Sequence, residues 1–324
     1  MTTGMLLGKF MPPHNGHLYL ARFAQNYVDD LTIVVGTLKD EPIPGELRHQ
    51  WMTELFPHAN VVHLAEELPQ HPDEHPDFWQ LWHDALMSVL PYKPDYVFAG
   101  EDYGGPLAKT LGAEFIPSNL GRGIIPTSGT DIRTHPFENW DYIPDIVRPY
   151  FVKRVCIVGP ESTGKSTLAE KLAASFDTVN VPEYAYTLID HNKRKNKELC
   201  LQDIEKIAQA QLSSENALAR HANKVLVCDT NMKTTEIWSK TLFQTCPNWI
   251  KEKATQQKYD LYLLMDTDAE WIDDLHRISP ETQAEHMKIW EDFLAQGKTP
   301  YQKLSGSWDE KFESAKDVIQ AALI

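Results

Sequence analysis

Two histidines, three positions apart, are the first residues in this chain whose types and spacing suggest chemistry. His14 and His17 lie in the stretch GKFMPPHNGH, residues 8–17, directly after the first apolar run. The stretch fits the pattern G-x-F-x-P-x-H-x-G-H, which average residue usage would produce by chance in on the order of one chain in a million. If a helix begins near Asn15, both imidazoles lie on one side of its first turn.

This arrangement favours phosphate binding. Backbone N–H groups at a helix start point toward an anion, and the preceding turn, Gly8, Lys9 and Phe10, adds a lysine. Such a site suits adenylyl transfer, in which the nucleophile is already an anionic phosphate and the transition state chiefly needs charge stabilisation. A metal site at the two histidines is the alternative, but no third ligand is placed nearby in the sequence.

A second element that could bind an anion is TSGTDIR, residues 127–133. Ser128 and Thr130 can cap a helix start, and Arg133 follows one turn later. Alone this stretch resembles many ordinary helix starts. Together with residues 8–17 it predicts a phosphate site built from two segments.

A third motif, GPESTGKST, fits the phosphate-loop pattern G-x-x-x-x-G-K-[ST] between an expected strand and an expected helix. A chance match to this pattern occurs in roughly one chain in a hundred. Lys165 would reach the β- and γ-phosphates and the Ser166 hydroxyl would bind Mg²⁺. The motif therefore predicts a site for ATP and Mg²⁺, with candidate residues Gly159, Glu161, Ser162, Thr163, Gly164, Lys165, Ser166 and Thr167.

Later residues predict phosphoryl transfer to a small acceptor. Asp229 ends an expected strand, where a carboxylate can hold Mg²⁺ or accept a proton from a hydroxyl. Glu183 also follows an expected strand, beside Tyr184 and Tyr186, which could stack on a flat ring. Arg277 lies in the polar stretch WIDDLHR and would supply positive charge from a lid. The alternatives are that Asp229 caps a helix and that Arg277 is a solvated charge.

Short apolar runs alternate with helical patterns, which predicts an α/β fold of two domains, each a parallel sheet flanked by helices. We place the domains at residues 1–151 and 152–324, joined by a packed connector, 134–151. Strands are expected at 5–7, 31–35, 61–64, 96–99, 114–116, 154–158, 224–228 and 260–265. Helices are expected at 17–28, 47–56, 78–90, 165–176, 201–221, 282–294 and 309–322.

Composition narrows the class of protein. The 324 residues carry a net charge of −15, which disfavours general nucleic-acid binding. The four cysteines form no C-x-x-C pair, and Cys156 and Cys228 fall in apolar runs, which predicts buried free thiols in a reducing compartment. Neither a targeting signal nor a membrane-spanning run is evident, so we expect a soluble, cytoplasmic protein.

Taken together, the motifs resemble a known group. GKFMPPHNGH with SGTDIR is similar to the nucleotidyltransferase superfamily, and the order of the two halves resembles NadR-type bifunctional proteins. The resemblance extends over nearly the whole chain. It implies a Rossmann-like nicotinamide-nucleotide (NMN) adenylyltransferase domain at 1–151 and a P-loop ribosylnicotinamide kinase domain at 152–324. The implied substrates are ATP, NMN and nicotinamide riboside, with Mg²⁺, without nucleic-acid or membrane partners, and with the homo-oligomeric state left open.

The resemblance also implies roles for residues of the first half. His14 and His17, with Lys9, would contact ATP phosphates, and Arg48 resembles an arginine that grips the triphosphate. Ser128, Thr130 and Arg133 match the second phosphate signature. Trp82 is expected against the nicotinamide ring, where a cationic ring over an indole is stabilised by up to about 2 kcal/mol. Trp79 is the competing candidate, and a purely structural tryptophan is the third reading.

Two departures from the family pattern matter. NadR proteins of enteric bacteria carry an N-terminal helix-turn-helix domain, whereas the first strand here is expected at about residue 4, so we expect no repressor role. Some relatives have an aromatic residue where this chain has Pro182, which leaves Tyr184 or Tyr186 as stacking partners. The rival functions are a different bifunctional pair, such as a flavin kinase with an adenylyltransferase, and a nucleotide-sensing regulator.

Overall fold

The computed structural model describes residues 1–121, 123–268 and 280–323, which form two units. The units divide between Val147 and Arg148, four residues before the boundary placed from the sequence. The difference arises because the Phe151 and Val152 N–H groups both donate to the Arg148 carbonyl, at 3.0 and 2.9 Å. This turn, which includes the short 3₁₀ helix η2 (Arg148–Tyr150), leads directly into the first strand of the second unit.

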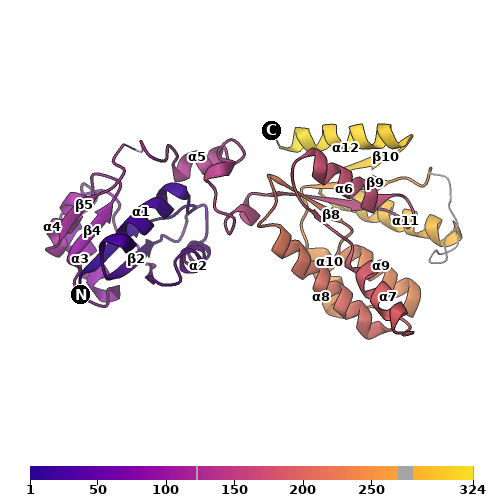
Figure 1. Ribbon diagram of the computed structural model, residues 1–324, viewed down its shortest axis with the longest axis horizontal. Helices are drawn as coiled ribbons and strands as arrows, with labels where there is room; N and C mark the ends of the chain where they lie inside the picture. The colour runs from indigo at the N-terminus through magenta and orange to yellow at the C-terminus, as the bar shows by residue number, and fades with distance from the viewer. Residues whose placement is uncertain (122, 269–279, 324) are drawn as a thin grey trace. The chain divides into compact units, whose positions relative to one another are not determined.

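The first unit is a parallel sheet in the order β3-β2-β1-β4-β5, covered by helices on both faces (Figure 1). Buried apolar runs form the central strands; for example, five consecutive residues of β2 are buried. The strands are β1 (Thr3–Gly8), β2 (Asp30–Gly36), β3 (Asn60–Leu64), β4 (Tyr96–Ala99) and β5 (Glu114–Pro117). The helices are α1 (Asn15–Tyr27), α2 (Gly45–Leu55), α3 (Phe78–Val89), α4 (Gly104–Leu111) and α5 (Gly129–Thr134).

The second unit is also a parallel sheet, in the order β10-β9-β6-β8-β7. The α/β class with two parallel sheets is thus confirmed. The strands are β6 (Lys153–Val158), β7 (Asn180–Val181), β8 (Val225–Asp229), β9 (Leu261–Met265) and β10 (Tyr301–Leu304). The helices are α6 (Lys165–Ser175), α7 (Tyr184–Arg194), α8 (Leu201–Leu218), α9 (Met232–Phe243), α10 (Asn248–Gln256), α11 (Pro280–Gln296) and α12 (Trp308–Ala322).

The expected strands lie within about two residues of the observed ones, but several elements were not expected from periodicity: α4, α7, α9, α10 and β10. Helix α9 shows why: Thr234, Thr235, Glu236 and Ser239 are all buried, so its inward face does not read as apolar. Strand β10 is an edge strand with one buried residue, Leu304, and therefore lacks a buried apolar run.

The connector is packed, as expected from its aromatic content. Trp140, Ile143 and Val147 are buried, and a 3₁₀ helix η1 (Trp140–Tyr142) lies within it. The four cysteines are free; Cys156, Cys228 and Cys246 are buried and Cys200 is partly exposed. Within the described part of the chain, no helix is both long and apolar enough to cross a membrane.

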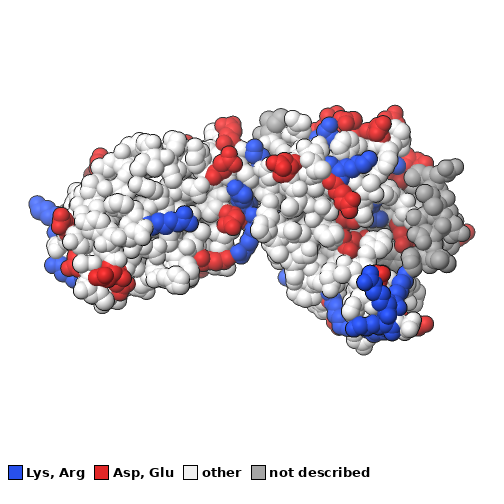
Figure 2. All heavy atoms as spheres, viewed as in Figure 1, with Lys and Arg blue, Asp and Glu red and all other residues white. Residues whose placement is uncertain are grey.

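Charge is unevenly distributed over the surface. Acidic side chains are scattered, whereas lysines and arginines gather over the far end of α7 (Figure 2). Lys193 and Arg194 lie in the last turn of α7 and Lys195 is its C-cap. Cations at a helix C-terminus are stabilised by the helix dipole, so this basic group has a structural explanation.

Candidate functional site

The first unit has a cavity of about 1090 Å³ at the carboxyl edge of its sheet. Residues that follow all five strands line it, which is the usual place for ligands in an open parallel sheet. Both sequence-distant signatures reach it: the turn after β1 and the start of α5 contribute to one wall. The residues of the sequence prediction that line the cavity are Gly8, Lys9, Phe10, His14, His17, Trp79, Trp82, Ser128, Thr130 and Arg133.

His14 begins α1 as its N-cap. Its Nδ1 accepts a hydrogen bond from the Gly16 N–H at 3.1 Å, so Nδ1 is unprotonated and a neutral ring carries its proton on Nε2. A Cβ at Gly16 would lie 2.8 Å from His14 Cε1. Glycine therefore lets the capping ring fold over the helix start, which explains its place between the two histidines.

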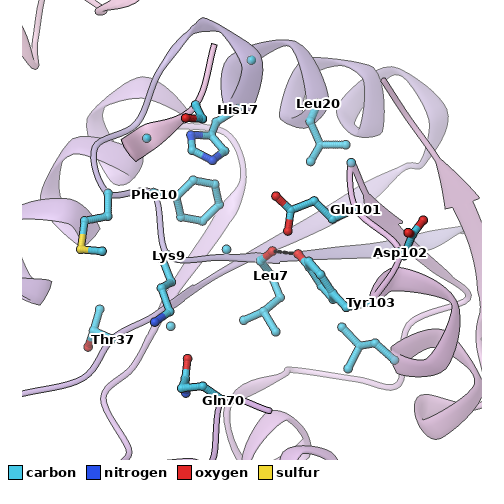
Figure 3. A pocket seen from close by; sticks show the side chains of 18 of the residues that line it. Leu7, Lys9, Phe10, His17, Leu20, Thr37, Gln70, Glu101, Asp102 and Tyr103 are labelled. Carbon is cyan, nitrogen blue, oxygen red and sulfur yellow. Dashed lines mark hydrogen bonds between the residues drawn. The ribbon is translucent and has the colours of Figure 1, made fainter. Parts of the chain in front are cut away.

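His17 lies one turn further and faces the same cavity (Figure 3). The His14 and His17 ring centroids are 3.8 Å apart, and Phe10 packs edge-on against His17 at 5.0 Å. Phe10 is buried in a left-handed conformation (φ 46°), and this places the ring beneath the imidazole. The turn thus holds both imidazoles beside the helix N-terminus, as an anion site requires.

The structure places Lys9 and Arg48 differently from one another. The Lys9 Nζ is 2.9 Å from Glu41 Oε1, on the cavity wall. Arg48 is fully buried; its Nη1 donates to the Lys9 carbonyl at 2.6 Å and its Nη2 pairs with Glu41. Arg48 does not line the cavity, because its guanidinium supports the Lys9 turn from behind. The triphosphate contact that the resemblance implies for Arg48 stays a prediction.

Burial and hydrogen bonds compete at the Glu41 carboxylate. Burial would raise the pKa of Glu41, but the Leu38 N–H, Lys9 and Arg48 together hold this pKa below its ordinary value. Glu41 is thus a carboxylate that links two cations. One carboxylate against two cations leaves the cluster positively charged, and Glu41 holds the Lys9 ammonium group at the cavity wall.

Helix α5 is joined to the β1–α1 turn through one carbonyl. The Arg133 guanidinium donates to the Met11 carbonyl, and a Cβ at Gly129 would lie 2.7 Å from the same oxygen. Ser128 caps α5 by accepting from the Asp131 N–H at 3.1 Å, and Arg133 Nη2 donates to Thr130 Oγ1 at 3.2 Å. The two signatures therefore contact each other, although more than a hundred residues separate them.

Trp79 and Trp82 both line the cavity and both pack against the apolar core of α3 and α4. The indole N–H of Trp82 donates to the Pro69 carbonyl at 2.9 Å, which fixes its ring. Each tryptophan therefore packs against the core and also faces the cavity, so a structural role does not exclude a ligand contact.

Several cavity residues were not found from the sequence, and they follow other strands of the sheet. Tyr103, after β4, donates its hydroxyl to the Leu7 carbonyl at 2.6 Å, and Glu101 and Asp102 lie beside it (Figure 3). The signal that could have found such residues is position at the carboxyl end of a parallel strand. The members of this set are Thr37, Glu66, Gln70, Glu101, Asp102, Tyr103, Ser118 and Asn119.

In the second unit, the phosphate loop connects β6 and α6. Gly159 and Gly164 adopt positive φ angles of 133° and 85°. A Cβ at Gly159 would lie 2.9 Å from the Met265 carbonyl, so glycine is required there. Lys165 is buried, and its Nζ donates to the Pro160 carbonyl at 2.7 Å. The loop thus has the curled backbone that a phosphate needs.

The remaining loop residues lie on or beside this backbone. Thr163 Oγ1 also donates to the Pro160 carbonyl, at 3.0 Å, and Ser162 has a left-handed φ of 64°. The Glu161 carbonyl accepts from Gln283 of α11 at 3.1 Å. Ser166 and Thr167 are exposed in the first turn of α6.

Asp229 and Glu183 come together beside the phosphate loop. Asp229 is buried at the end of β8; burial raises its pKa, while the Ser166 hydroxyl and Lys165 lower it. Burial also raises the pKa of Glu183 to about 7, with Lys165 opposing and Asp229 adding to the rise. Burial is the main cause, because it disfavours the charged form of a carboxyl group, and the neighbouring Asp229 carboxylate adds to it.

Three further residues were predicted beside the acceptor or the ATP of this site: Tyr184, Tyr186 and Arg277. Tyr184 packs against the apolar cluster of α8 and α10, and its N–H donates to Gln211 Oε1 at 2.8 Å. Tyr186 is exposed. Arg277 lies outside the residues that the structure describes.

The chain is similar in sequence to several known proteins. A family model described as an AAA domain matches residues 154–311. The trifunctional NAD biosynthesis/regulator protein NadR of Escherichia coli K12 is 30% identical over 293 residues, 84% of this chain and 71% of the relative. A nicotinamide-nucleotide adenylyltransferase of Thermococcus kodakarensis is 27% identical over 192 residues, 56% of this chain and 98% of the relative.

The fold is also that of solved structures. A crystal structure of a NadR protein in complex with NR superposes with a TM-score of 0.80 at 21% sequence identity, covering 99% of this chain and 96% of that one. A second, of a NadR protein in complex with NAD and AMP-PNP, gives a TM-score of 0.75 at 22% identity, covering 99% and 96%. With the two phosphate signatures gathered at one cavity, a phosphate loop in the second unit and 30% identity to a curated relative across most of both chains, this chain belongs to the NadR family.

Proposed function

We propose that this chain is a bifunctional enzyme that forms NAD from nicotinamide riboside in two steps. The second unit phosphorylates the riboside with ATP to give NMN. The first unit transfers the adenylyl group of a second ATP to NMN, giving NAD and pyrophosphate. The observation that carries the proposal is that His14, His17, Ser128 and Arg133 line one cavity of about 1090 Å³, large enough for two nucleotide-sized ligands.

Adenylyl transfer needs no general base, because the attacking NMN phosphate is already an anion. The His14 and His17 imidazoles, Lys9 and the α1 N-terminus hold the ATP phosphates and stabilise the charge that develops on the leaving pyrophosphate. Ser128, Thr130 and Arg133 hold the phosphates from the opposite segment. Trp82 or Trp79 stacks on the cationic nicotinamide ring, a favourable contact for an indole face.

Phosphorylation of the riboside starts from a neutral hydroxyl and therefore benefits from a carboxylate. Glu183 lies beside the loop with a pKa of about 7, so it can accept the 5′-hydroxyl proton near neutral pH. Lys165 would leave the Pro160 carbonyl and pair with the β- and γ-phosphates. Tyr186, and Tyr184 from its more packed position, are the aromatic candidates for the acceptor ring.

The residues beside the phosphate loop also fit Mg²⁺. Within the described chain, Asp229 Oδ1 is buried without a hydrogen-bond partner, and the Ser166 hydroxyl lies next to this carboxylate. Mg²⁺ commonly binds one or two protein oxygens together with substrate phosphates. When bound, the ion neutralises charge on the β- and γ-phosphates. We place the enzyme in the cytoplasm, a reducing compartment, which the four free cysteines support.

Mass spectrometry of the products from nicotinamide riboside, ATP and Mg²⁺ tests the proposal. NMN should form first and NAD should follow, with one ADP from the first step and one pyrophosphate from the second. Riboflavin in place of the riboside should give neither FMN nor FAD. Flavin nucleotides would indicate the other kinase–adenylyltransferase pair, and a protein that binds ATP but turns over neither acceptor would indicate a nucleotide sensor.

A further inference from the structure

Trp308 lies against the phosphate loop, although the sequence separates the two by more than 140 residues. A Cβ at Gly164 would be 3.2 Å from Cη2 of the Trp308 ring. The placement follows from the sheet: β6 and β10 are parallel to β9, so the segments that follow them leave from the same edge. Helices α6 and α12 lie side by side (Figure 1) and pack on the same apolar cluster of the sheet.

The segment that carries Trp308 is held firmly. The Ser305 hydroxyl donates to Asp266 at 2.7 Å, and Asp268 accepts from the Gly306 N–H and pairs with Lys311. Ser307 then caps α12 in a reciprocal pair with Glu310. The backbone that carries the indole is therefore held in place before any ligand binds, which reduces the entropy lost on binding.

The Trp308 ring is nevertheless open to solvent. It is 38% exposed, although a tryptophan used only for packing would be expected to be more buried. Lys171 of α6 places its Nζ 5.2 Å from the ring centroid, so the ring already makes one cation–π contact. Tyr301 is similarly exposed, at 44%, but lies at the amino end of β10, the edge opposite the loop.

We propose that Trp308 stacks on the nucleobase of the ATP whose phosphates occupy residues 159–167. This inference rests on the proposed kinase function and adds the residue that binds the base. A triphosphate in the loop must direct its ribose and base out of the loop, and an exposed indole lies beside Gly164 there. Because every base has a π face, stacking discriminates weakly between bases. The kinase unit should therefore accept GTP as well as ATP, within about tenfold in kcat/KM.

The test compares Trp308→Ala, Trp308→Phe and the control Tyr301→Ala in the intact chain. Trp308→Ala should raise the KM for ATP in riboside phosphorylation by about 5- to 100-fold, with kcat changed far less. Trp308→Phe should restore most of the loss, and Tyr301→Ala should behave as wild type. An unchanged KM in Trp308→Ala would overturn the proposal.

Inorganic tripolyphosphate separates base binding from damage to the loop. As a competitor of ATP it should inhibit wild type and Trp308→Ala with the same Ki, because it has no base. An equal weakening of tripolyphosphate and ATP would show that Trp308 only supports the loop, which would also overturn the proposal.

Fluorescence distinguishes failure of this inference from failure of the proposed function. ATP with Mg²⁺ should quench the tryptophan fluorescence of the wild type more than that of Trp308→Phe. This difference should vanish when both proteins also carry Lys165→Ala. No riboside phosphorylation by the wild type would contradict the proposed function, while the quench would still report whether a base meets Trp308. Equal quenching of wild type and Trp308→Phe would contradict the stacking alone.

Discussion

At the scale of single residues, the two neighbouring histidines of the first unit do different work. His14 caps α1 through Nδ1, so its removal would remove a helix cap, at a cost of about 0.5–2 kcal/mol, as well as the proposed phosphate ligand. His17 has no such capping role in α1. Substitution of His17 therefore tests charge stabilisation in the cavity without loss of the α1 helix cap.

His17→Ala should lower adenylyl transfer from ATP to NMN by about 10²- to 10³-fold, because one donor to the developing charge is lost. Riboside phosphorylation should be unchanged, since His17 belongs to the first unit. Steady-state assays of both reactions on the same preparation measure the two effects. Near-normal adenylyl transfer would remove His17 from the site.

Glu183 should give the kinase reaction a distinct pH dependence. Its pKa of about 7 is raised by burial, so the carboxylate is protonated below that pH and cannot accept the hydroxyl proton. The kcat/KM for the riboside should rise with pH and level off above about pH 7. In Glu183→Gln this limb should disappear and riboside use should weaken, while ATP binding stays unchanged. If Glu183→Gln still showed this rise of kcat/KM with pH, another group would be responsible, and Asp229 would be the next candidate.

At the scale of elements, the first site depends on how closely α5 approaches the β1–α1 turn. Gly129 makes that approach feasible, because a Cβ would collide with the Met11 carbonyl at 2.7 Å. The Met11 carbonyl belongs to the backbone and cannot rotate away as a flexible side chain can. Helix α5 would therefore have to shift, and Ser128 and Arg133 would shift with it.

Gly129→Ala should therefore reduce adenylyl transfer by tenfold or more, because small misplacements of binding groups are costly. The matched control is Gly123→Ala: a Cβ at Gly123 meets nothing within 4 Å. Initial rates at saturating and limiting ATP provide the measurement. Equal rates for the two alanine variants would show that α5 does not position the phosphates.

At the scale of the whole molecule, each unit has its own sheet, its own apolar core and its own proposed phosphate site. The two reactions should then be separable. Lys165→Ala should stop riboside phosphorylation and leave the conversion of NMN to NAD intact, since Lys165 lies in the second unit.

A mixture of two variants, each lacking one of the two activities, tests this independence directly. His17→Ala and Lys165→Ala together should convert riboside to NAD after a lag, because NMN made by the first protein diffuses to the second. Each variant alone should form little or no NAD from riboside. A mixture that made NMN but no NAD would indicate that the intermediate cannot pass between molecules.

The sequence by itself determined the features that depend on local chain geometry. Buried apolar runs located strands such as β2 and β8. The spacing around His14 and Lys165 located the two turns that begin α1 and α6, because each turn is built from consecutive residues. Since parallel strands place their carboxyl ends at one edge, the sequence could also direct Asp229 and Glu183 to one site.

Only the tertiary structure decided which residues distant in the sequence contact those turns. The sequence did not indicate that packing would bury Arg48 against the Lys9 turn together with Glu41. Trp308 carries no motif, and its contact with Gly164 exists because β10 and β6 belong to one sheet. The physical reason is the same in both cases: the direction of a side chain relative to a distant segment is set by the packing of whole elements, which no short stretch of sequence encodes.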